Sequence, residues 1–185
     1  MYKVIEWSPD LDLTEFYAEA QRRGFVNNSS KKAMIDCFNN ESKSKVWILY
    51  QDERAIGSVA AHSFDDVMGL NSYRILTRVC TFAEARPKKG LITANRLISE
   101  HQNLTDQFLL PACIRWAGTE NIYSTSTSQD VASQRMVHRI YFPTLERKGL
   151  VTCLGKINYR HTDQTLWKIN GQAFLDDLER YPRWI

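Results

Sequence analysis

Three basic residues and a glycine lie close together in the middle of the chain. Arg86, Lys88 and Lys89 place three positive charges within four residues, and Gly90 follows directly, before a predicted helix. The first N–H groups of a helix have no partner within it and lie at the positive end of its dipole, which suits a phosphate. Glycine lets the backbone approach a ligand closely. The segment predicts a phosphate-binding loop, with a solvated basic loop as the alternative.

A run of hydroxyl side chains forms a second candidate site. Serine and threonine alternate from Ser124 to Ser128, at the end of a predicted strand. Such side chains hydrogen-bond a polar ligand or cap the helix that follows. We assign ligand binding to Ser126, and helix capping remains the alternative.

The cysteines and histidines do not show the spacing of a metal site. Successive cysteines are more than 30 residues apart, no C-x-x-C pair occurs, and no two histidines stand in H-x-x-x-H. Structural zinc sites normally need such close pairs. We therefore expect no bound metal, and free thiols in a reducing cytoplasm. The residues concerned are Cys37, Cys80, Cys113 and Cys153, and His62, His101, His138 and His161.

Length and composition indicate one globular domain over residues 1–185. Hydrophobic residues make up 43% and charged residues 24% of the chain, which excludes a disordered chain and a coiled-coil rod. No stretch approaches the roughly 20 apolar residues that span a membrane. Charged residues among the first ten argue against a signal peptide. The net charge of +3 permits an anionic partner without requiring one.

Hydrophobic periodicity and turn residues predict the elements that must position these side chains. Strands are expected at residues 2–7, 45–50, 54–63, 73–82, 122–126, 150–159 and 164–169. Helices are expected at residues 13–20, 30–38, 92–101, 104–116, 131–140 with a continuation to 148, and 171–179. This order predicts an α/β (α+β) fold with a mixed, mostly antiparallel central sheet and helices on both faces. The strands at 73–82 and 122–126, joined through helices, suit a parallel crossover.

The order of elements resembles the GNAT superfamily of N-acetyltransferase-like proteins, as a divergent member, over most of the chain. In that family the fourth strand leads into a loop of the type Arg/Gln-x-x-Gly-x-Gly/Ala, whose amides hold the pyrophosphate of acetyl-CoA. Arg86 to Leu91 stand at this place, although Arg86 and Gly90 are one residue further apart and Ile92 replaces the second small residue. The resemblance implies acetyl-CoA or a related acyl-CoA as co-substrate and an unidentified amine as acceptor.

The resemblance also implies roles for individual residues. The acyl-CoA would lie along Val79, Cys80, Thr81 and Phe82, with Arg86, Lys88, Lys89, Gly90 and Leu91 on its phosphates and Ser126 on its arm. The family often has a tyrosine, which protonates the departing thiolate, on the helix that ends before a Gly-Phe-like pair. Gly149 and Leu150 resemble that pair, and Tyr141 is the candidate acid, with a core position as the alternative.

An amine acceptor must lose a proton before or during its attack on the thioester. His62, Glu84 and His138 are the candidate bases, and each has a structural or solvated role as its alternative. Cys80 has no histidine partner in the sequence, so an inert thiol is the favoured interpretation over a nucleophile.

Two other functions remain open. Basic and aromatic residues alternate near the C-terminus, which favours a nucleic-acid-binding or nucleic-acid-modifying GNAT-like protein, although the small net charge does not support it. The irregular loop and the missing tyrosine four residues before Gly149 are typical of a GNAT-like module without catalytic activity.

Overall fold

The computed structural model describes residues 1–24, 30–39, 44–63, 73–82, 104–127, 137–159 and 162–180. The predicted phosphate loop and the helix at 92–101 lie outside these residues. Contacts divide the chain into two compact units. The first unit is Met1–Ser63 with Ile75–Trp116, and the second unit is Phe64–Arg74 with Ala117–Ile185. No helix among the described residues is long and apolar enough to cross a membrane.

Antiparallel strands form the sheet of the first unit: β1 (Tyr2–Glu6), β2 (Ser44–Gln51) and β3 (Arg54–Ser63). The strands predicted at 45–50 and 54–63 pair as a hairpin, and Asp52 takes the left-handed φ of 55° that its tight turn requires. Gly57 lies beside a shift in register, because Leu49 faces Gly57 while the next residue, Tyr50, faces Ala55. Such a shift in register is a β-bulge.

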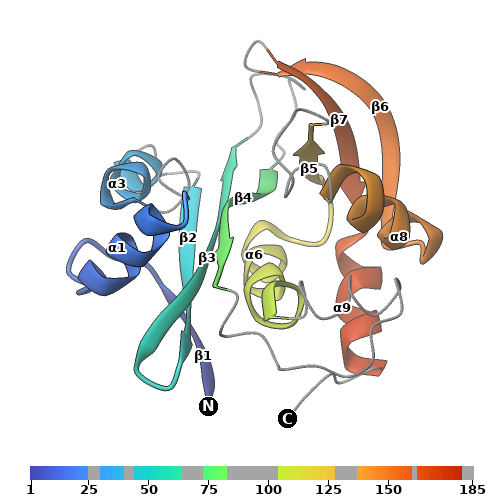
Figure 1. Ribbon diagram of the computed structural model, residues 1–185. Coiled ribbons are helices and arrows are strands. Elements are labelled where there is room, and N and C mark those ends of the chain that lie inside the picture. The colour runs from blue at the N-terminus through green and yellow to red at the C-terminus, as the bar shows by residue number, and fades with distance from the viewer. Residues whose placement is uncertain are drawn as a thin grey trace. The chain divides into compact units, whose positions relative to one another are not determined.

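Helices cover both faces of this sheet, as the sequence predicts. α1 (Thr14–Arg22) and α3 (Lys31–Asn39) lie on one side of the strands, and α6 (Leu110–Ala117) lies on the other (Figure 1). The π-helical turn η3 (Thr105–Leu109), which leads into α6, packs against β1, β2 and β3.

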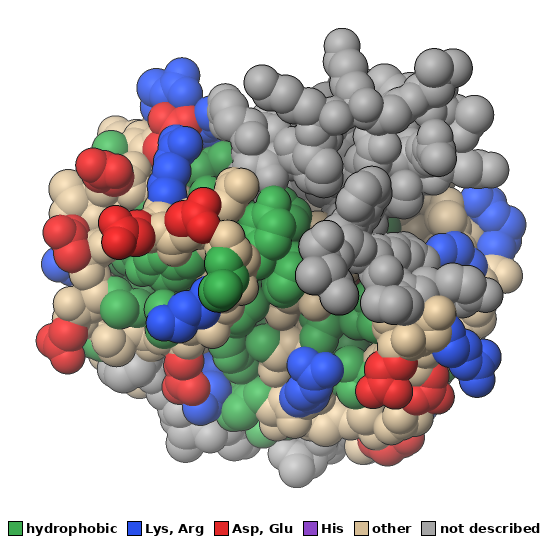
Figure 2. Space-filling view, turned by 90° about the horizontal axis from the view of Figure 1, so that it is seen from below, with side chains coloured by type: hydrophobic (Ala, Val, Ile, Leu, Met, Phe, Trp, Pro, Cys, Tyr) green, Lys and Arg blue, Asp and Glu red, His purple; other side chains and the backbone are tan. Residues whose placement is uncertain are grey.

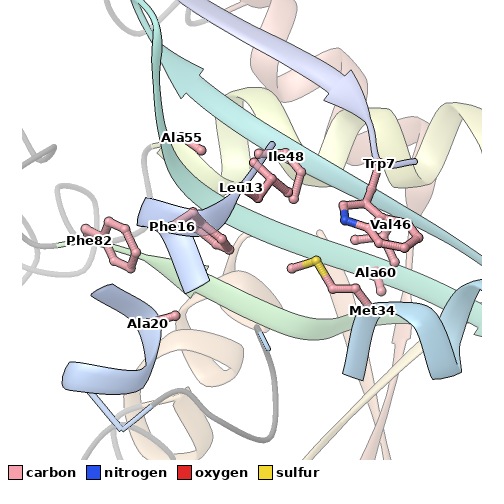
Figure 3. Close-up of a cluster of buried hydrophobic side chains, with 10 residues drawn as sticks. All are labelled: Trp7, Leu13, Phe16, Ala20, Met34, Val46, Ile48, Ala55, Ala60 and Phe82. Carbon is pink, nitrogen blue, oxygen red and sulfur yellow. The ribbon is translucent and has the colours of Figure 1, made fainter. Parts of the chain in front are cut away.

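Apolar side chains from α1, α3 and the strands form the core of the first unit (Figure 3). Met34 is fully buried and Phe16 is 3% exposed. Trp7 donates its indole N–H to the hydroxyl of Tyr17 at 3.0 Å, so a polar group at the edge of the core has its partner. Burial raises the pKa of Tyr17 above its usual 10.0. The core members are Trp7, Leu13, Phe16, Ala20, Met34, Val46, Ile48, Ala55, Ala60 and Phe82.

The second unit contains β5 (Ile122–Ser126), β6 (Val151–Tyr159) and β7 (Thr162–Ile169), with β7 antiparallel to both neighbours. The long strands β6 and β7 curve together (Figure 1). β4 (Tyr73–Thr81) begins in this unit, where Tyr73 pairs with Ile122 and Arg74 with Tyr123 in parallel. The predicted parallel crossover is confirmed. β7 begins at Thr162, two residues earlier than the predicted residue 164.

Proline shapes two helices in the same way. The π-helical turn η4 (Val137–Tyr141) leads into α8 (Phe142–Arg147), and Pro143 is the second residue of α8. Likewise η3 leads into α6, whose second residue is Pro111. Proline donates no N–H and its ring crowds the carbonyl four residues earlier, and a widened π turn relieves both effects. Within the helix predicted at 104–116, Pro111 is therefore accommodated by a wider turn and does not end the helix.

Glycines end one helix of the second unit and begin another. Gly149, at a φ of 72°, donates its N–H to Glu146, and Leu150 donates to Leu145, which is the Schellman arrangement. The predicted helix end at Gly149 is confirmed. Gly171 opens α9 (Gly171–Arg180), and a Cβ there would lie 2.8 Å from the Cα of Thr119. A side chain at position 171 would therefore displace backbone.

Glu19 on α1 carries an acid-sensitive ion pair, which gives a testable prediction. Arg22 donates to it at 2.6 and 2.8 Å and Arg23 donates as well, and these hydrogen bonds lower the pKa of Glu19 from 4.5 to about 2. A lowered folded-state pKa gives stability that is complete above pH 4.5 and is lost as the pH falls toward 2.

We expect Glu19→Gln to unfold at a lower urea concentration than the wild type at pH 7. The difference between the two midpoints should shrink as the pH is lowered from 4.5 toward 2. A difference that stays constant across that range would show that the carboxylate does not contribute through its charge. Glu15→Gln, on the same helix, is the matched control.

Candidate active site

Three polar side chains form a hydrogen-bonded chain at the C-terminal end of β5. Ser126 is the last residue of that strand and is 5% exposed. The indole Nε1–H of Trp167 donates to Ser126 Oγ at 2.8 Å. The same oxygen lies 2.9 Å from Nδ1 of His138. We call Trp167, Ser126 and His138 the polar relay.

Each member of the relay comes from a different element of the second unit. Ser126 faces Thr165 on β7, so Trp167, two residues further along, lies on the same face of the sheet at the diagonal position. His138 is supplied by η4, the turn before α8. The strand register and the helix together aim two polar groups at one buried hydroxyl.

Aromatic packing fixes the position of the relay. Phe142 stacks on Trp167 with ring centres 4.9 Å apart and an angle of 9° between the planes. Phe142 follows His138 by one turn, so the same helical segment supplies both a polar and an apolar contact to the relay. Phe142 is 1% and Trp167 is 4% exposed, so water is excluded from this side.

Tyr141, the candidate acid, is 4% exposed and lies against Phe142 at 5.1 Å between ring centres. Leu145, four residues before Gly149, is also buried. Because η4 is a π turn, the helix is not regular at Tyr141, so the spacing of an ideal helix does not hold there.

His62 and the β4 residues lie in the first unit. His62 is half-buried at the end of β3, with Nδ1 2.8 Å from the carbonyl oxygen of Ser63. Val79, Cys80 and Thr81 lie on β4, as predicted. Phe82 is 2% exposed, packs on Phe16 and donates its backbone N–H to Ile56 at 2.9 Å. The ring therefore lies in the core, and the cofactor contact predicted for Phe82 stays a prediction.

The remaining predicted site residues lie outside the described part of the chain. They are Glu84, Arg86, Lys88, Lys89, Gly90 and Leu91.

The sequence predicts free, unreactive thiols and no bound metal. Cys113 and Cys153 are free, as predicted. Burial raises the pKa of the Cys113 thiol well above its usual 9.0, which keeps it protonated and unreactive. Among the residues that the structure describes, no cluster of histidine, cysteine and acidic side chains is placed to hold a metal ion.

A groove of about 570 Å³ runs along α1 in the first unit. Its walls carry both carboxylates, such as Glu15 and Glu53, and guanidinium groups, such as Arg22 and Arg54. Acidic and basic side chains are also interspersed among apolar ones on the face drawn in Figure 2. Such a mixture of charges does not select a ligand of one sign.

No known family model and no curated protein matches the sequence. Solved structures do match the fold. An acetyltransferase of the GNAT family from Streptococcus pneumoniae superposes with a TM-score of 0.54 at 13% identity, over 90% of this chain and 97% of that one. The ribosomal-protein-alanine N-acetyltransferase from Brucella melitensis gives 0.53 at 13% identity, over 90% and 99%. FeeM, an N-acyl amino acid synthase from uncultured soil microbes, gives 0.51 at 8% identity, over 98% of each chain.

The chain has a divergent GNAT fold. The resemblance predicted from the element order is confirmed, as is the mixed, mostly antiparallel sheet. In this GNAT fold the polar relay lies at the C-terminal end of the fifth strand, and it contains two of the predicted candidate residues, Ser126 and His138.

Two aromatic residues that favoured nucleic-acid binding are buried in this fold. Tyr159 and Trp167 are each 4% exposed, so their faces are not offered to bases. Trp167 serves the relay instead. Sequence analysis missed this role, and no simple alternation marks position 167, because β7 buries both Leu166 and Trp167.

Proposed function

We propose that the protein is an acyl-CoA-dependent N-acyltransferase, with acetyl-CoA as the first donor to test. The observation that carries the proposal is the polar relay at the end of β5, in a fold whose named neighbours are acyltransferases. Fold alone does not define function, so the buried polar side chains are needed to support it. A reducing cytoplasm, which keeps Cys113 and Cys153 free, is the proposed location.

The proposed reaction is direct transfer without a covalent enzyme intermediate. The amine nitrogen of the acceptor attacks the thioester carbonyl, a C–N bond forms, the C–S bond breaks and CoA leaves as a thiolate. The nitrogen loses a proton, for which His62 and Glu84 are the proposed bases, and Tyr141 is the proposed acid for the thiolate. Amides of Val79, Cys80 and Thr81 are proposed to bind the acyl-CoA, with Ser126 beside its arm.

The phosphates of CoA are proposed to bind the segment from Arg86 to Leu91. Its three positive charges and its glycine support this, because the start of the helix predicted to follow would offer unpaired N–H groups to a phosphate.

Titration calorimetry with acetyl-CoA and with CoA tests the proposal first. We expect both to bind, and Lys88→Ala with Lys89→Ala to weaken both by about 10-fold, because a phosphate contact is lost. Absence of binding at millimolar acetyl-CoA would overturn the proposal. Lys31→Ala with Lys32→Ala, on exposed positions of α3, is the charge-matched control.

Acceptors can be screened by measuring CoA release chromatographically. The names of the neighbours suggest a peptide with an N-terminal alanine and a free amino acid as the first two amines.

A further inference from the structure

The hydrogen bonds of the relay define which atom of His138 carries a proton. The indole of Trp167 is a donor only, so Ser126 Oγ accepts from it. The hydroxyl has one proton, and among the described residues its second partner is His138 Nδ1. A buried hydroxyl proton without an acceptor is costly, so the hydroxyl donates to Nδ1. The neutral imidazole then carries its proton on Nε2.

The partial exposure of His138 leaves room for a ligand beside its ring. The ring is half-buried, while Ser126 and Trp167 behind it are almost fully buried. Within the described part of the chain, Nδ1 makes the polar contact of the ring and Nε2 makes none. The relay therefore holds the ring from one side and leaves an oriented N–H on the other.

A neutral imidazole in this state is a hydrogen-bond donor and a poor proton acceptor at Nε2. Fixed neutral imidazoles of this kind polarise a carbonyl without transferring a proton. This changes the role that the sequence suggested for His138, because a general base needs a free lone pair on the nitrogen that faces the substrate.

We infer that His138 donates its Nε2–H to the acyl oxygen of the thioester and stabilises the negative charge that develops there. The inference rests on the proposed function. In this proposal His138 is the catalytic residue, because its Nε2–H would contact the acyl oxygen. Ser126 and Trp167 are positioning residues, because they act only through the orientation and protonation of the ring.

Two substitutions at position 138 separate this role from a structural one. Asparagine retains an acceptor near the position of Nδ1, which preserves the contact with Ser126, but it has no group at Nε2. Glutamine places an amide N–H near the position of Nε2. If His138 has a structural role, His138→Asn should reduce activity less than His138→Gln. If His138 is a hydrogen-bond donor to the substrate, His138→Gln should reduce activity less than His138→Asn.

We expect His138→Asn to lower kcat about 100-fold, as loss of one oxyanion donor typically does, with the KM for acetyl-CoA little changed. His138→Gln should retain activity within about 10-fold of the wild type, because an N–H donor remains. Arg139→Gln, on the exposed neighbouring residue, is the matched control and should keep the wild-type rate. The assay is CoA release with the best acceptor of the panel.

Nitrogen NMR of labelled protein tests the inference without an acceptor. At neutral pH we expect the His138 proton on Nε2, a mixture of tautomers in Ser126→Ala, and a shift of the Nε2 resonance when acetyl-CoA is added to the wild type.

The outcomes distinguish the inference from the proposed function. If acetyl-CoA does not bind, the proposed function fails, and this inference fails with it. If acetyl-CoA binds but the Nε2 resonance does not move, or the proton lies on Nδ1, only the inference is overturned. Equal activity of His138→Asn and the wild type overturns it in the same way.

Discussion

Replacing Trp167 by alanine is expected to lower the free energy of unfolding by about 3–5 kcal/mol. The indole is 4% exposed and stacks on Phe142, so its removal leaves a cavity lined by an aromatic ring. The substitution also removes the donor to Ser126, whose hydroxyl is buried. Burial of a polar group with a lost partner adds to the cost of the cavity.

Trp167→Phe separates these two contributions. Phenylalanine retains a ring to stack on Phe142 but has no N–H for Ser126, so we expect a smaller loss of about 1–2 kcal/mol. Urea unfolding followed by far-ultraviolet circular dichroism measures both variants without depending on tryptophan emission. Lys168→Ala, the next residue on β7, is the control. A loss below about 1 kcal/mol for Trp167→Ala would contradict the described packing.

Phe82→Ala is the second change with a large expected effect, about 3–5 kcal/mol of stability. The ring is 2% exposed, lies 5.2 Å from the ring of Phe16 and carries the guanidinium of Arg23 over its face at 5.2 Å. Cavity formation and loss of the cation–π contact, worth about 0.5–1 kcal/mol, act together.

The same position tests whether Phe82 contacts acyl-CoA. Phe82→Leu keeps most of the apolar volume, so we expect a loss of about 1–1.5 kcal/mol and unchanged affinity for acetyl-CoA by calorimetry. A clear loss of affinity in Phe82→Leu at retained stability would show that the ring serves the ligand and not only the core. Phe16→Leu, in contact with the same ring, is the matched control.

The order of strands and helices could be predicted because local chemistry agrees with tertiary packing in these elements. The run KVWILY in β2 is rich in β-branched and aromatic residues, and the structure buries most of its side chains. The end of α8 was also readable, because Gly149 supplies the left-handed conformation that the helix end needs. The π turns before Pro111 and Pro143 could not be predicted. A proline indicates that a helix is disturbed, but not whether the helix ends, kinks or widens there.

The candidate site was only partly readable for a different reason. The position of Ser126 at a strand end drew attention to it, but its partners come from β7 and η4. The side chains that contact a strand residue depend on the strand register and on where the helices pack, and the local sequence predicts neither. Phe82 shows that a residue at the end of a strand can close a core, and its predicted contact with the acyl-CoA stays a prediction.

The division of the chain has a consequence for synthesis on the ribosome. The residues of the first unit are complete once Trp116 has been made, but β4 begins with Tyr73 and Arg74, which belong to the second unit. Their partners Ile122 and Tyr123 are translated only afterwards. The pairing of β4 with β5 therefore cannot form until Tyr123 has been translated. Because each unit consists of two separate segments, no single cut in the gene would yield either unit whole.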